Sequence, residues 1–114
     1  MIVDIAGRSW TERQLQDRCV DLARRFGWLA VHFGGDQHGR AHYDAAGFPD
    51  LLLVHPGRNL IWFRELKSAK GKLTDRQQRW YDYLADSGIN VAVWRPADWP
   101  DIVQALSFGK AWVA

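Results

Sequence analysis

Hydrophobic residues recur at helical spacing near the start of the chain. Between Ser9 and Gly27 the apolar positions repeat with a period of about 3.6 residues, which predicts an amphipathic helix. Ser9 and Glu12 fit a capping box at its start, and Gly27 is typical of a helix end. Glu12 falls on the same stripe as the apolar residues, so we expect it to face inward. The apolar stripe consists of Leu15, Cys19, Leu22, Ala23 and Phe26.

Two continuous apolar runs in the middle of the chain predict a β-hairpin. Residues 51–54 and 60–63 flank a Pro/Gly/Asn turn cluster at 55–59, so the two strands should pair antiparallel. Pairing about the turn centre places Val54 near Leu60. Because neither run alternates with polar residues, we expect both strands to be central and buried on both sides.

The remaining elements complete an α/β fold with a mixed four-stranded sheet flanked by helices. The connection after the hairpin passes through a helix, so the last strand should lie parallel to its neighbour. We expect one domain over residues 1–114, with a core at about 11–106 and the element order α-β-β-β-α-β-α. The further elements are a strand at 28–33, a helix capped by Thr74 and Gln77 that closes at Ser87-Gly88, a strand at 90–95, and a C-terminal helix at 99–108 capped by Asp98.

Composition narrows the class of protein. Hydrophobic residues make up 47% of the 114 residues and charged residues 25%, as in ordinary globular domains. The net charge of +2 does not by itself require a polyanionic partner, so any basic surface must be local. One cysteine excludes an internal disulfide and a cysteine-based zinc site. No apolar run approaches the length of a membrane span, so we expect a cytoplasmic protein without a membrane partner.

Two carboxylates and an ammonium group occupy the ends of the predicted hairpin strands. Asp50 directly precedes the first strand, and Glu65 and Lys67 follow the second. These ends lie side by side in a hairpin, and Glu65 and Lys67 share a face because side chains alternate. Paired carboxylates beside a sheet interior are costly unless a cation neutralises them, and Mg²⁺ prefers oxygen ligands. The pattern predicts a metal-dependent phosphodiesterase in which Lys67 polarises the attacking water; the alternative is a turn cap at Asp50 and a plain Glu65–Lys67 pair.

Glu12 and Gln77 each have two possible roles. Glu12 lies on the inward stripe, so its carboxylate can point at the metal directly or through water, or it can merely bond the Ser9 amide. Gln77 is either a capping partner of Thr74 or an inward amide that orients Lys67 or a DNA phosphate. The sequence leaves both pairs of alternatives open.

Basic residues gather just after the predicted catalytic strand. They can contact a phosphate backbone, helped by the amide groups at the start of the helix that Thr74 caps, although a solvated charged face is the common meaning of such a run. Residues 34–47 are polar, glycine-punctuated and aperiodic, which predicts a loop; it carries Arg40 and His42, where a phosphate contact is possible. The basic residues of the first group are Lys70, Lys72, Arg76 and Arg79.

Taken together, these motifs resemble the VRR-Nuc domain of the PD-(D/E)XK nuclease superfamily. The resemblance rests on Gly47-Phe48-Pro49-Asp50-Leu51, Glu65-Leu66-Lys67, Gly71-Lys72-Leu73-Thr74, Gln77-x-x-Trp80 and Gly88-Ile89-Asn90-Val91, within a restriction-endonuclease-like αβββαβ order.

The resemblance implies an Mg²⁺- or Mn²⁺-dependent endodeoxyribonuclease. For small standalone, phage-type members it implies homodimers that cut branched DNA such as Holliday junctions, in a bacterial cell or a phage-infected host. It also implies that Asp50, Glu65 and the Leu66 carbonyl bind the metal, that Glu12 assists, and that Gln77 is functional. The alternatives are a catalytically inert DNA-binding or scaffold module on the same fold, and a flap or nicking nuclease.

Overall fold

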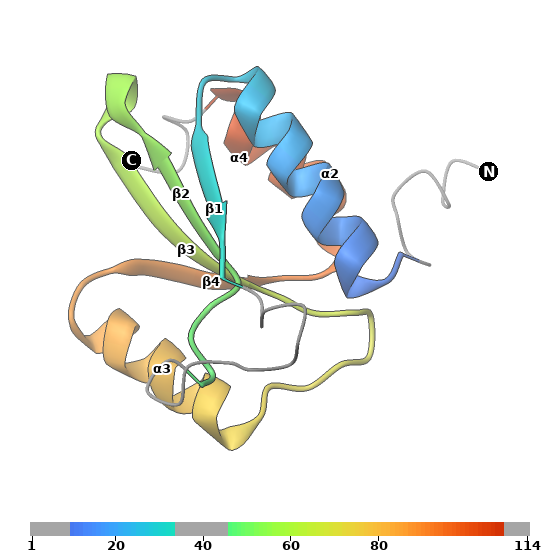
Figure 1. Cartoon of the computed structure of the whole chain (residues 1–114), viewed down its shortest axis with the longest axis vertical. Coiled ribbons are helices and arrows are strands. Elements are labelled where there is room, and N and C mark those ends of the chain that lie inside the picture. The colour runs from blue at the N-terminus through green and yellow to red at the C-terminus, as the bar shows by residue number, and fades with distance from the viewer. Residues whose placement is uncertain (1–9, 34–45, 109–114) are drawn as a thin grey trace.

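The computed structural model describes residues 10–33 and 46–108, and its elements follow the predicted order (Figure 1). Residues 34–45, with Arg40 and His42, lie outside the described part. Among the described helices, none is long and apolar enough to cross a membrane. The elements are α2 (Glu12–Arg25), β1 (Leu29–His32), β2 (Leu51–His55), a 3-10 turn (Pro56–Arg58), β3 (Leu60–Leu66), α3 (Asp75–Asp86), β4 (Asn90–Trp94), a second 3-10 turn (Pro96–Asp98) and α4 (Trp99–Phe108).

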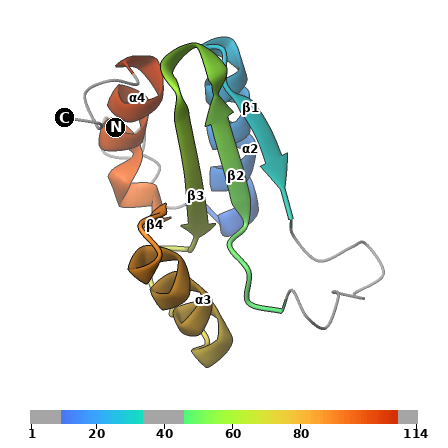
Figure 2. The ribbon, with the colours of Figure 1, turned by 90° about the vertical axis from the view of Figure 1, so that its left-hand side faces the viewer.

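The four strands form one mixed sheet in the order β1-β2-β3-β4. β1 and β3 both pair antiparallel with β2, whereas β4 runs parallel to β3, as the helical connection between them requires. α2 packs against β1, β3 and α4, while α3 packs against β4. Figure 2 shows α3 beyond the end of β3, at the opposite end of the sheet from the hairpin turn. The mixed, helix-flanked sheet expected from the sequence is confirmed.

The sheet has one buried face and one face that is partly open. Toward α2 and α4, Leu53 and Trp62 are buried. On the other face, Val31 is 47% and Ile61 is 58% exposed, because α3 packs against β4 and leaves the strands near the hairpin turn uncovered. The expectation that the hairpin strands are buried on both sides is therefore wrong for this part of the sheet. We call this surface the open face; its exposed apolar side chains are Leu29, Val31, Phe33 and Ile61.

α2 begins later than the sequence suggested. Thr11, not Ser9, is the N-cap: its hydroxyl accepts a hydrogen bond from the Gln14 amide at 3.1 Å, and the Gln14 side chain accepts one from the Thr11 amide at 3.0 Å. Both Ser9-x-x-Glu12 and Thr11-x-x-Gln14 match the same capping pattern, so the local rule alone cannot choose between them. Glu12 is thus the first helical residue and not a capping partner. Of the predicted stripe, Leu15, Cys19 and Ala23 are buried, Leu22 is half-buried and Phe26 is 44% exposed.

The hairpin turn is one residue shorter than predicted. His55 pairs with Leu60, and the turn consists of the 3-10 segment followed by Asn59 in the left-handed conformation, at φ 58°. Asparagine tolerates this conformation better than most residues. The shorter turn shifts the strand register by one residue, since Val54 pairs with Ile61 and not with Leu60.

The capping prediction for α3 is confirmed, and the one for α4 is not. Thr74 and Gln77 form the expected reciprocal box, and α3 ends at Ser87 before Gly88, whose φ of 79° suits glycine. Asp98 instead ends the second 3-10 turn, and its carboxylate accepts a hydrogen bond from the Arg95 amide at 2.8 Å.

Candidate active site

Asp50 and Glu65 meet at the end of the sheet where β2 begins and β3 ends. Leu51 pairs with Arg64, so the next position along the two strands places Asp50 beside Glu65. One oxygen of the Asp50 carboxylate (Oδ2) accepts a hydrogen bond from the Leu66 amide at 2.8 Å. This bond fixes the Asp50 side chain across the strand pair.

Lys67 completes the predicted group of three. Its ammonium lies 3.7 Å from the Glu65 carboxylate, and both side chains are nearly buried. The Lys67 amide donates to the Trp94 carbonyl at 3.0 Å, which extends the β3–β4 pairing past the end of β3. The sheet therefore holds the backbone of Lys67, and alternation along the strand turns its side chain to the same face as Glu65.

Glu65 lies in an environment that opposes its negative charge. Burial, followed by the charge of Asp50 and a hydrogen bond with Asp50, raises the pKa of Glu65 from 4.5 to about 8. The ammonium of Lys67 acts in the opposite direction but does not cancel these effects. Two carboxylates packed together with one ammonium form a centre that a further cation would stabilise.

The segment before Asp50 is anchored by aromatic packing and by a glycine. The Phe48 ring makes edge-to-face contacts with Phe33, Phe63 and Trp80, at centroid distances of 5.3, 5.5 and 5.0 Å. Gly47 has a φ of 85°, and a Cβ there would lie 2.6 Å from the backbone of Arg76. The Gly47-Phe48-Pro49 sequence therefore docks onto α3 and places Asp50 at the start of β2.

Gln77 both caps α3 and points its side-chain amide inward. Its side-chain oxygen accepts the Thr74 amide at 2.9 Å, and its side-chain nitrogen donates to the Glu65 carboxylate at 3.0 Å. The cap fixes the orientation of the amide, so the nitrogen has to point at Glu65. The inward contact is with Glu65, whereas the sequence suggested Lys67 or a DNA phosphate as the partner.

Glu12 lies on the surface, at the first position of α2. Its charge contributes to the raised pKa of Glu65, so it lies within electrostatic range of the centre. Within residues 10–33 and 46–108, however, no three His, Cys, Asp or Glu side chains form a group that could hold a metal. The structure thus brings Asp50, Glu65, Lys67 and Gln77 together, and leaves Glu12 at the periphery.

Four of the predicted DNA-contacting residues follow Lys67 in the chain. Lys70 and Lys72 are exposed in the turn after Lys67, and Arg76 and Arg79 are exposed on the first turns of α3. Arg76 also interacts with another part of the chain.

The donor set fits a hard divalent cation. Asp50 and Glu65 offer carboxylate oxygens, and the Leu66 carbonyl follows Glu65 directly in the chain. Oxygen ligands of this kind suit Mg²⁺ and Mn²⁺ and not softer metals. Burial and the neighbouring Asp50 raise the pKa of Glu65, and a bound cation would act in the opposite direction by favouring the charged form.

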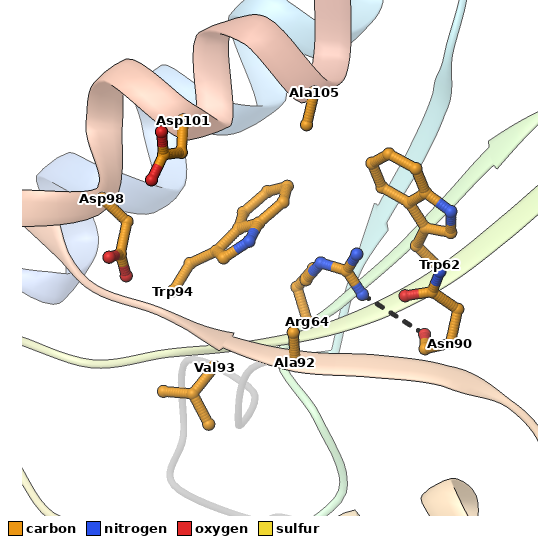
Figure 3. A pocket seen from close by; sticks show the side chains of 9 residues that line it. All are labelled: Trp62, Arg64, Asn90, Ala92, Val93, Trp94, Asp98, Asp101 and Ala105. Atoms are coloured by element: carbon orange, nitrogen blue, oxygen red, sulfur yellow. Dashed lines mark hydrogen bonds between the residues drawn. The ribbon is translucent and has the colours of Figure 1, made fainter. Parts of the chain in front are cut away.

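A cavity of about 370 Å³ lies on the buried face of the sheet, separate from the candidate site. Figure 3 shows Arg64 in this cavity between Trp62 and Trp94, whose ring centroids lie 4.7 and 4.9 Å from the guanidinium carbon. Arg64 donates to the Phe63 and Asn90 carbonyls and so ties β3 to β4. Because Arg64 and Glu65 are neighbours on one strand, they point to opposite faces, and the cavity does not open onto Glu65.

Comparisons with known proteins agree with this arrangement. The sequence profile of the VRR-NUC domain matches residues 39–98, which include Asp50, Glu65, Lys67 and Gln77 but not Glu12. The chain belongs to the VRR-NUC domain family. A solved structure described as a VRR_NUC domain superposes with a TM-score of 0.62 and 26% sequence identity, covering 84% of this chain and 95% of that one.

One relative is a much longer protein than this chain. The Fanconi-associated nuclease 1 homolog of Caenorhabditis briggsae is 35% identical over 48 residues, which is 42% of this chain but only 6% of that protein. The VRR-NUC assignment confirms the family and the fold that the motifs suggested, and it identifies the chain as a nuclease domain.

Sequence reasoning gave no role to Arg95, which follows β4. Its guanidinium donates hydrogen bonds to the carbonyls of Ser68 and Gly71, in the turn after Lys67. A lone arginine before a proline carries no recognisable motif, so only the tertiary contact reveals it.

Proposed function

We propose that this VRR-NUC domain is an Mg²⁺- or Mn²⁺-dependent endodeoxyribonuclease that cuts branched DNA such as Holliday junctions. The observation that carries the proposal is the convergence of a half-buried Asp50 with the nearly buried Glu65 and Lys67. A plain surface Glu–Lys pair is worth less than about 1 kcal/mol and needs no second carboxylate beside it. The arrangement is therefore better suited to chemistry than to stability.

In the proposed mechanism, Asp50, Glu65 and the Leu66 carbonyl hold the cation. When bound, the cation would lower the pKa of a water molecule and stabilise charge on the phosphate. Lys67 orients the attacking water and balances negative charge that develops on the phosphate oxygens. Gln77 holds the Glu65 carboxylate in one orientation. Lys70 and Lys72, exposed in the adjacent turn, contact the DNA backbone.

A symmetric cut in a four-way junction requires two active sites, so we propose that the domain acts as a homodimer. The open face supports this proposal, since exposed apolar side chains that gather on one surface often mark a protein–protein interface. Trp99, another candidate for the interface, packs edge-to-face on Trp10 at 5.2 Å and is half-buried. The apolar residues Ala111, Trp112 and Val113 are further candidates for the interface, and they lie outside the described residues. Ile61→Lys on the open face should therefore produce monomers in a mass measurement, whereas Arg58→Lys in the nearby turn should not.

Cleavage of a labelled four-way junction tests the catalytic proposal. With Mg²⁺ or Mn²⁺ present, Asp50→Ala and Lys67→Ala should each abolish product formation while the protein stays folded. Asp50→Asn is the sharper variant, because an amide oxygen can still accept the Leu66 amide while the charge is lost. Asp75→Asn, an exposed acid at the start of α3, is the matched control and should cut at the wild-type rate. Near wild-type cutting by either Asp50 or Lys67 variant would show that the roles are wrong.

The same assay addresses the competing functions. An inert DNA-binding or scaffold module would bind the junction and release no product with either metal. Flap and nicked substrates in the panel distinguish a flap or nicking nuclease, which would leave the four-way junction uncut or cut on one strand only.

A further inference from the structure

We propose that Arg95 is a positioning residue for catalysis: through the turn at residues 68–71, it sets the direction of the Lys67 side chain. This inference rests on the proposed nuclease function of Lys67. Arg95 lies outside the catalytic group, directly after β4, and touches neither carboxylate.

One nitrogen of the Arg95 guanidinium (Nη1) bridges the two ends of the turn at residues 68–71. It donates to the Ser68 carbonyl at 2.8 Å and to the Gly71 carbonyl at 2.6 Å. The turn has one weaker bond of its own, from the Gly71 amide to the Ser68 carbonyl at 3.3 Å. Charge-assisted bonds are stronger than neutral ones, so Arg95 supplies most of the hydrogen bonding that fixes this turn.

This turn packs against the Lys67 side chain. A Cβ added to Gly71 would lie 3.4 Å from the Lys67 side-chain carbon Cδ and 3.0 Å from the Ser68 hydroxyl. Gly71 therefore lies in van der Waals range of the Lys67 side chain, and the tighter neighbour of an added Cβ would be the Ser68 hydroxyl. If the turn moves, the nearly buried Lys67 loses the surface that directs its ammonium toward Glu65.

Arg95 is itself held rigidly, as a positioning residue must be. Its amide donates to Asp98 at 2.8 Å, and the next residue is the buried Pro96. Strand β4, which precedes Arg95, also provides the Trp94 carbonyl that holds the Lys67 backbone. The end of β4 therefore positions Lys67 in two ways: Trp94 binds the Lys67 backbone, and Arg95 holds the turn that flanks the Lys67 side chain.

The experiment is a single-turnover cleavage titration with four variants. Arg95→Ala should lower the maximal rate about 10- to 100-fold, as expected for a small misplacement of a catalytic group, with little change in the half-saturating protein concentration. Arg95→Lys should recover part of the rate, since an ammonium can donate to the same carbonyls. Gly71→Ala should lower the maximal rate in the same direction by disturbing the turn, because the added methyl would lie 3.0 Å from the Ser68 hydroxyl. Arg24→Ala is the matched control, because it also removes a guanidinium–carbonyl bond, of 3.2 Å to Ala30, but far from the site.

Hydrogen exchange at the Gly71 amide separates failure of this inference from failure of the proposed function. Exchange should accelerate in Arg95→Ala and not in Arg24→Ala, whatever the enzyme cuts. A wild-type maximal rate in Arg95→Ala, an equal loss of rate in Arg24→Ala, or no recovery in Arg95→Lys would overturn the positioning role. If the wild-type protein cleaves no DNA, the nuclease proposal fails, and unchanged Gly71 exchange in Arg95→Ala would then overturn the positioning role as well.

Discussion

Replacing Glu65 by glutamine should make the metal-free protein more stable at pH 8 and change its stability far less at pH 5. Glutamine is the neutral counterpart of protonated glutamate, and its oxygen can still accept the hydrogen bond from Gln77. The reason is the pKa of Glu65, which burial and Asp50 raise to about 8. Between pH 4.5 and about 8 the folded wild type binds a proton that the unfolded chain has released. The free energy of unfolding therefore falls as pH rises through this window and is regained as pH is lowered.

The size of the effect follows from the shift. Since one pKa unit corresponds to about 1.4 kcal/mol, a pKa that moves from 4.5 to about 8 limits the loss to at most about 5 kcal/mol at pH 8. Domains of this size are stable by only about 5–15 kcal/mol, so even half of that loss is easily measured. Half of the maximal loss corresponds to a drop in Tm of roughly 10 °C, at about 4 °C per kcal/mol.

Thermal unfolding in EDTA from pH 5 to pH 8 measures this effect. Wild type should lose stability steadily across the range, and Glu65→Gln should show a much flatter profile. Glu12→Gln removes a surface carboxylate whose charge is the smallest of the causes that raise the pKa of Glu65, so it should change the profile only slightly. Equal pH dependence in wild type and Glu65→Gln would refute the claim that Glu65 is protonated in the metal-free fold.

Three further predictions concern residues around the site. Gln77→Glu keeps an oxygen to cap Thr74 but places a carboxylate against Glu65, so cleavage at fixed metal should fall more than tenfold (about 1.4 kcal/mol) while helix content by circular dichroism is retained. Gly47→Ala should lower the free energy of unfolding, measured by urea denaturation, by about 2 kcal/mol or more, because Gly47 has a positive φ and α3 leaves no room for a side chain. Gly88→Ala should lower it less, because Gly88 has a similar φ but open space around it. Arg64→Met should unfold at the same or a higher temperature, since the arginine is buried and no described carboxylate forms an ion pair with it; a loss above about 3 kcal/mol would contradict this.

Elements governed by local rules were predictable from the sequence. The α3 cap follows from the spacing of Thr74 and Gln77, and the hairpin follows from a turn cluster between two apolar runs. Once the hairpin is placed, alternation and strand ends bring Asp50, Glu65 and Lys67 together without further information. The parallel pairing of β4 follows because a helix connects it to β3.

Features that depend on contacts distant in sequence could not be predicted. Periodicity gave Glu12 an inward face, but the overlapping capping patterns hid the true start of α2. The apolar character of Ile61 suggested burial, whereas the position of α3 leaves it exposed. The double role of Gln77 and the contact of Arg95 with the turn after Lys67 appear only when strands and helices are assembled.

Anomalous scattering from crystals soaked in Mn²⁺ would locate the cation that the Asp50–Glu65 pair is proposed to bind. We expect a single strong peak in contact with the Asp50 and Glu65 carboxylates and the Leu66 carbonyl, and its loss in Asp50→Asn. A peak that lies elsewhere, or carboxylates that bind no manganese under conditions where the enzyme cuts DNA, would contradict this proposal.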